Sequence, residues 1–115
     1  MLRDIIRNLS NGFGRFKGQT IGVVDERGEI AAIYKGIPQN DIGIRTDVID
    51  NVPKPEAMRI LVRSMAPQII ACDEIGSKED IEAINYVMCY ILCLFQNLLY
   101  LTLLFDYIQF VVLLF

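Results

Sequence analysis

Apolar residues at the start of the chain recur with the period of an amphipathic helix. Between Leu2 and Leu9 they are spaced by three and four residues, which predicts a helix with one face on a core. Asn11 and Gly12 then provide the end of this helix, because glycine accepts the left-handed conformation that closes many helices. We therefore expect the chain to begin with a helix that packs on the rest of the fold.

Runs rich in β-branched and aliphatic residues predict strands. TIGVVD over residues 20–25 and EIAAIYK over residues 29–35 are separated by a turn, so we predict that they form a hairpin. Residues 36–51 are rich in Gly, Pro, Asn and Asp, which predicts a loop or a loop with a short element. A third strand is predicted for QIIACD, residues 68–73.

Helical spacing returns twice in the second half of the chain. Apolar residues from Met58 to Met65 predict a helix with prolines at its entry and Pro67 after its end. The sequence SKED, residues 77–80, has the pattern of a capping box and predicts the start of another helix. The order helix, two strands, loop, helix, strand, helix is typical of an α/β fold in which helices cover a sheet.

The composition changes near Tyr90. Residues 1–89 have the mixed composition of a folded domain, whereas residues 90–115 are mostly apolar and carry the single charge of Asp106. The run without charged residues extends from Ala83 to Phe105 and exceeds the roughly 20 residues with which a helix crosses a bilayer. We therefore expect a long apolar C-terminal helix. Two origins stay open for this tail, a transmembrane anchor or a sequence translated out of its original frame.

Charge and residue types exclude several classes of function. Eleven Lys and Arg against fourteen Asp and Glu give a net charge of −3, and the basic residues form no block, which argues against nucleic-acid binding. The sequence contains no histidine, so histidine-based catalysis and histidine metal ligands are excluded. Its three cysteines lie in apolar segments, which is typical of reduced thiols in a cytoplasmic protein.

The acidic pair after the third predicted strand is the main candidate for chemistry. Four apolar or small residues followed by Asp73 and Glu74 match a Walker B segment, in which the first carboxylate holds Mg²⁺ and the second polarises the attacking water. The alternative interpretation is that both acids lie in a turn between a strand and a helix, where negative charge interacts favourably with the positive end of the helix dipole. Asp25 and Glu26 form a similar pair, for which a simple turn is the alternative.

A phosphate-binding loop of the form GxxxxGK[ST] would complete such a site, and the sequence does not contain one. The glycine-rich stretch GFGRFKG, residues 12–18, has Lys17 before Gly18 and leads into a predicted strand where a helix is required. We therefore interpret this stretch as a turn.

The segments DER-x-EIA, PQND-x-G-x-RTDV and RSM-x-P followed by DEIG together resemble the stage III sporulation protein AA family, over about residues 1–89. The resemblance implies ATPases of endospore-forming bacteria with a P-loop NTPase core of the RecA or AAA type. It implies that Asp73 contacts Mg²⁺, that Glu74 is the catalytic carboxylate, and that Asp25 and Glu26 face the same nucleotide. It also implies that a phosphate loop precedes the counterpart of Leu2 to Asp4.

Two departures from the family pattern limit what the chain is expected to do. By the resemblance, a phosphate loop is expected just before Met1 and is not among these 115 residues, and the apolar tail stands where another core strand is expected after Cys89. We therefore expect a partial ATPase core over residues 1–89 that is inactive alone and holds neither ATP nor Mg²⁺ tightly. The alternative is a non-hydrolytic, membrane-anchored protein that binds partners.

The resemblance also implies a setting for the chain. Its expected partners are other stage III sporulation proteins, and a homo-oligomer and a membrane are left open, while no nucleic acid is expected. The expected location is the cytoplasm of the mother cell of a sporulating bacterium, with membrane association if the tail is an anchor.

Overall fold

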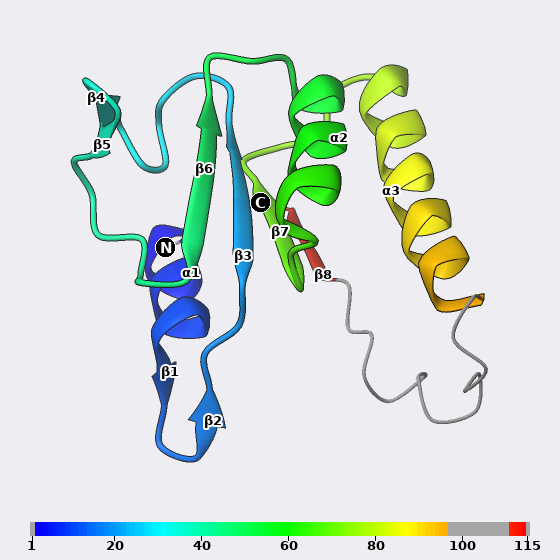
Figure 1. Ribbon diagram of the computed structural model, residues 1–115. Helices are drawn as coiled ribbons and strands as arrows, with labels where there is room; N and C mark the ends of the chain where they lie inside the picture. Colours follow the sequence, from blue (N-terminus) through cyan, green and yellow to red (C-terminus); the bar gives the residue numbers. More distant parts are fainter. Residues whose placement is uncertain (1, 97–110, 115) are drawn as a thin grey trace.

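The computed structural model describes residues 2–96 and 111–114, and their centre is a four-stranded parallel sheet. The strands lie in the order β6-β3-β7-β8, with parallel pairing between all neighbours (Figure 1). Their bounds are Ile21–Asp25 for β3, Thr46–Asp50 for β6, Ile69–Cys72 for β7 and Val111–Leu114 for β8. The carboxyl ends of these strands therefore meet at one edge of the sheet.

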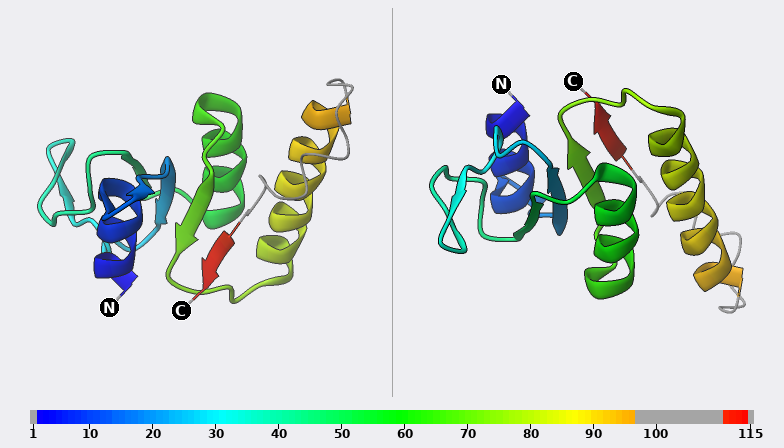
Figure 2. Two further views of the ribbon diagram at one scale, coloured as in Figure 1. Left: turned by 90° about the horizontal axis from the view of Figure 1, so that it is seen from below. Right: turned by 90° about the horizontal axis from the view of Figure 1, so that it is seen from above.

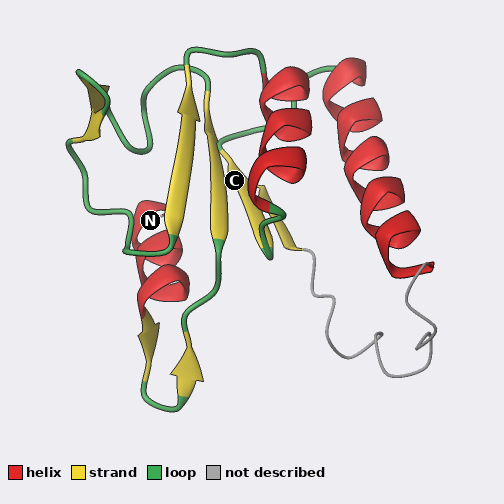
Figure 3. Cartoon of the chain, in the orientation of Figure 1, coloured by secondary structure: helices red, strands yellow, loops and turns green. Residues whose placement is uncertain are grey.

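Helices cover both faces of the sheet. Figure 2 shows α1 (Leu2–Asn11) on one side and both α2 (Lys54–Met65) and α3 (Lys78–Gln96) on the other. Two short antiparallel hairpins complete the described fold (Figure 3), formed by β1 (Gly12–Phe13) with β2 (Phe16–Lys17) and by β4 (Ile33–Tyr34) with β5 (Ile37–Pro38). The mixed α/β architecture predicted from the order of elements is confirmed.

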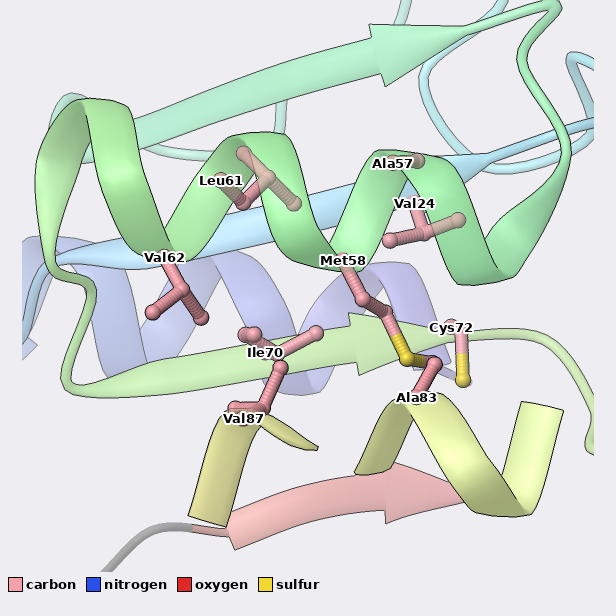
Figure 4. Packing of buried hydrophobic residues seen from close by; sticks show 9 residues of the cluster. All are labelled: Val24, Ala57, Met58, Leu61, Val62, Ile70, Cys72, Ala83 and Val87. Atoms are coloured by element: carbon pink, nitrogen blue, oxygen red, sulfur yellow. The ribbon is translucent and has the colours of Figure 1, made fainter. Parts of the chain in front are cut away.

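The central strands are buried on both faces, because successive side chains point to opposite sides of the sheet. Val24 and Ile70 face α2 and α3, where they pack with Met58 of α2 and Val87 of α3 (Figure 4). The alternate positions in β3 and β7 contribute to a second core that includes Ile6 of α1. One sheet thus separates two hydrophobic cores.

Helix α2 lies especially close to β3 at Gly22. A Cβ atom at this position would come within 3.1 Å of both methyl carbons of Leu61, so glycine allows the helix to approach. The absence of a side chain at Gly22 therefore lets α2 pack directly on β3.

The predicted loop over residues 36–51 contains the short strand β5 and the longer strand β6, and the approach of the chain to β6 is fixed by the end of α1. The hydroxyl of Ser10 accepts a hydrogen bond of 2.7 Å from the backbone N–H of Arg45, and the Asn11 side chain accepts one of 2.9 Å from Ile44. The Arg45 guanidinium donates to the carbonyl oxygen of Ser10 at 3.1 Å. These bonds direct the chain into β6 beside β3.

The predicted hairpin of residues 20–25 with residues 29–35 is wrong. β3 pairs in parallel with β6 and β7, and only Ile33–Tyr34 of the second run forms a strand, in the small β4–β5 hairpin. The physical reason is that β3 is buried on both faces and needs parallel neighbours on both edges, which a two-residue strand cannot supply.

The predicted long apolar helix is wrong for its last part. Helix α3 continues through Cys89 to Gln96, but Val111–Leu114 form strand β8 on the free edge of β7, and the β-branched valines of this segment favour a strand. Within the described residues no helix is long and apolar enough to span a membrane. The rest of the predicted span, residues 97–110 and 115, lies outside the described residues, and the division at residue 89 stays a prediction.

Candidate functional site at the carboxyl edge

Three neighbouring parallel strands carry acids where they end. Asp50 closes β6, and its register partner Asp25 closes β3. β7 ends at Cys72 and is followed at once by Asp73 and Glu74. The carboxyl edge of a parallel sheet is where ligands of α/β folds bind, so these acids lie at the expected position for a site.

Lys54, the first residue of α2, joins two of these strand ends. Its Nζ lies 3.4 Å from Oε2 of Glu26 and 3.5 Å from Oδ1 of Asp73. The Lys54 side chain is only 6% exposed, whereas those of Glu26 and Asp73 are 40% and 18% exposed. The carboxylates after β3 and β7 therefore converge on one cationic position.

The charge of Lys54 is maintained by these neighbours. Burial lowers the pKa of Lys54, but the charges of Asp73 and Glu26 and their hydrogen bonds outweigh this effect and raise the pKa above its usual value. Asp73 is held further by the backbone, because its Oδ1 also accepts a hydrogen bond of 2.9 Å from the N–H of Glu74. The side chain of Asp73 is thus fixed from two sides.

Glu74 lies in a more open position than Asp73. Its Oε1 is 3.2 Å from Nη2 of Arg27, and the two side chains are 53% and 60% exposed. Exposed ion pairs of this kind contribute about 0–1 kcal/mol, because water and salt screen them. Glu74 can therefore leave Arg27 at little cost.

Asp25 has different surroundings from Glu26. Asp25 is only 1% exposed. Its two carboxylate oxygens accept hydrogen bonds from the backbone N–H groups of Ile30 and Ala31, at 3.0 and 2.9 Å. Both oxygens thus hold the loop after β3. The predicted contact between Asp25 and a nucleotide stays a prediction, as do the predicted roles of Glu26, Asp73 and Glu74.

The sequence interpretation missed Lys54 and Arg27. A signal for Lys54 was present, because a basic residue in the first turn of a helix opposes the helix dipole and needs another reason to be there. Prolines at positions 53 and 55 frame it and fix the start of α2. Arg27 lies in an ordinary turn and gave no comparable signal.

The oxygen donors at this edge suit Mg²⁺, which proteins commonly hold with one or two carboxylates together with substrate phosphates and water. In the part of the chain that the structure describes, no group of three or more Cys, Asp and Glu side chains is arranged to hold a metal ion alone. Burial raises the pKa of the nearby Cys72 thiol to about 11, so this thiol stays protonated at neutral pH and is a poor metal ligand. The residues therefore fit Mg²⁺ that arrives with further ligands.

Comparisons with known proteins agree with the resemblance seen in the sequence. The family described as "Sporulation stage III, protein AA" matches residues 1–98. The chain is 44% identical over 84 residues to the "Stage III sporulation protein AA" of Bacillus subtilis (strain 168), in an alignment that covers 73% of this chain and 27% of the relative. The chain thus spans about a quarter of the length of the curated relative it matches. No solved structure matches the chain significantly.

Proposed function

Since the chain belongs to the stage III sporulation protein AA family, we propose that it forms the metal-binding and water-activating part of an ATP-hydrolysing domain that serves endospore formation. The observation that carries the proposal is the convergence of Glu26 and Asp73 on one cation position, within 3.5 Å of Nζ of Lys54. Glu74 follows directly and is exposed at the same edge.

The positions of the acids support the roles that we propose for them. Asp73 is fixed by the backbone and largely buried, which suits a carboxylate that holds Mg²⁺ through the water molecules bound to the ion. The metal, when bound, would neutralise charge that develops on the phosphates. Glu74 is accessible, which suits a carboxylate that orients a water molecule and accepts its proton.

The reaction assigned to this edge is hydrolysis of the γ-phosphate. The water oxygen forms a bond to the γ-phosphorus, the bond from that phosphorus to the bridging oxygen breaks, and ADP and phosphate result. Glu74 takes a proton from the water. Phosphate recognition in such sites depends on backbone N–H groups and a lysine of a glycine loop, and the GxxxxGK[ST] pattern is not among these 115 residues.

The 115-residue chain alone is therefore expected to show no appreciable Mg²⁺-dependent ATP hydrolysis. A phosphate-release assay checks this expectation. Turnover by the chain alone that is lost in Glu74→Gln would show that the acids work without a phosphate loop.

A chimera tests whether the acids act when a phosphate loop is supplied. The matched segment of the Bacillus subtilis relative is replaced by that of this chain, and both ATP binding and Mg²⁺-dependent phosphate release are measured. We expect Glu74→Gln to slow phosphate release by about 100-fold or more while ATP binding is retained, because a proton acceptor is lost.

The matched control for the chimera is Glu79→Gln, which removes the same charge from an exposed position in the first turn of α3. Equal rates for Glu74→Gln and Glu79→Gln would contradict the catalytic role of Glu74. A second variant, Asp73→Asn, is expected to raise the Mg²⁺ concentration that the chimera needs.

A further inference from the structure

Lys54 is buried far more deeply than an ordinary surface lysine. Its side chain is 6% exposed although α2 begins at this residue, and its long stem reaches from the helix to the ends of two strands. Burial of an ammonium group is costly unless carboxylates pair with it. Glu26 and Asp73 supply this pairing at 3.4 and 3.5 Å.

The same oxygen atoms are the ones that would approach a metal ion. Oδ1 of Asp73 and Oε2 of Glu26 are the carboxylate oxygens next to Nζ of Lys54. A divalent ion on these oxygens would stand within a few ångströms of the ammonium, and like charges at that distance repel strongly in a partly buried site. The two cations therefore exclude each other.

We propose that Lys54 is an internal cation that occupies the metal position between Glu26 and Asp73, so that a divalent ion binds there only when the ammonium moves away. This inference rests on the proposed function and adds the regulation of the same site. Phosphate oxygens would offer the displaced ammonium a new anionic partner, whereas a free metal ion offers none. The site accordingly favours a metal that arrives together with a phosphate-bearing ligand over the free ion.

The test measures Mn²⁺ binding to the full chain without nucleotide, from the electron paramagnetic resonance signal of the free ion. We expect Lys54→Gln to bind Mn²⁺ at least about tenfold more tightly than the unmodified chain, because a competing unit charge is removed. The double variant Lys54→Gln, Asp73→Asn should lose this gain. Lys17→Gln is the matched control, since Lys17 is exposed in β2 at the opposite end of the sheet (Figure 1).

Mn²⁺ affinity in Lys54→Gln that is no higher than in Lys17→Gln would overturn the proposal and leave Lys54 a purely structural residue. Circular dichroism shows whether Lys54→Gln folds. Should it not fold, the unmodified chain decides the question through reductive methylation of its lysines, read by mass spectrometry.

In that second measurement Lys54 should be protected relative to Lys17 and should become more reactive at high Mg²⁺ concentrations. Unchanged protection of Lys54 at those concentrations would also overturn the proposal. Neither measurement uses ATP, so the internal-cation proposal and the ATP-hydrolysis proposal can each fail while the other holds.

Discussion

Substitution of Asp25 tests the structural role of this buried residue. Its carboxylate is buried and accepts one hydrogen bond on each oxygen, from the N–H groups of Ile30 and Ala31. Asp25→Ala would leave both backbone donors without these partners inside the fold. Each buried group that loses its partner costs about 1–3 kcal/mol, so we expect a loss of about 2–6 kcal/mol in the free energy of unfolding.

A loss of this size is large compared with the total stability of a small domain, about 5–15 kcal/mol. At about 4–8 °C per kcal/mol, the thermal midpoint of Asp25→Ala should fall by at least about 8 °C. Asp25→Asn keeps one acceptor and turns an amide N–H₂ group toward the other backbone donor. Its stability should therefore lie between those of the unmodified chain and Asp25→Ala.

Urea unfolding followed by far-ultraviolet circular dichroism measures these differences. The control is Asp47→Ala, which removes the same side chain from an exposed position of β6, where a change within about 0.5 kcal/mol is expected. If Asp25→Ala and Asp47→Ala unfold at the same urea concentration, the two hydrogen bonds do not stabilise the fold and the reasoning is refuted.

Three further outcomes follow from the packing of α2, α3 and β7. Ser77→Ala should lower the free energy of unfolding by about 1 kcal/mol in urea titrations, because the Ser77 hydroxyl accepts the Asp80 N–H at the start of α3. Met58→Ala should lower it by about 2–5 kcal/mol in the same assay, since Met58 is 1% exposed in the core under α2. Iodoacetamide at pH 8 should label the exposed Cys89 and leave Cys72 unlabelled until urea unfolds the chain. The reason is that Cys72 is buried and its pKa is raised to about 11. Peptide mass spectrometry distinguishes the two sites.

The helices could be predicted from the sequence because their signals are local. At the start of α3 the Ser77 hydroxyl accepts the Asp80 N–H at 3.1 Å, and the Asp80 carboxylate accepts the Ser77 N–H at 3.0 Å. This reciprocal pair is the capping box that the spacing of SKED predicts. The period of apolar residues in α1 and α2 is likewise contained within each helix, so both were found near their observed bounds.

Strand pairing was harder to predict because it depends on segments far apart in the chain. β6 has the sequence TDVID, whose side chains are exposed or half-buried at the edge of the sheet, and its polar composition resembles that of a loop. Its direction is set by bonds from the end of α1 to Ile44 and Arg45, which the sequence does not reveal. A local turn signal after β3 therefore suggested a hairpin that the fold does not form.

The candidate site was predictable only in its acids. Strand ends place Glu26, Asp73 and Glu74 at one edge, and a pattern of apolar residues followed by acids predicts this. The cations that pair with these acids are Lys54, at the start of α2, and Arg27, in the turn after β3. Only the tertiary fold brings both to this edge of the sheet.

The two ion pairs at this edge differ in what is needed to break them. Arg27 and Glu74 are more than half exposed, so water replaces either partner and separation costs at most about 1 kcal/mol. Lys54 is almost fully buried, and removing one partner from a buried charge is far more costly unless another partner replaces it. Solvent alone can therefore release Glu74 from Arg27, whereas an incoming anion would favour the displacement of Lys54 from the proposed metal position. Under the internal-cation proposal, metal binding rather than the freeing of Glu74 is therefore the step that a phosphate-bearing ligand would promote.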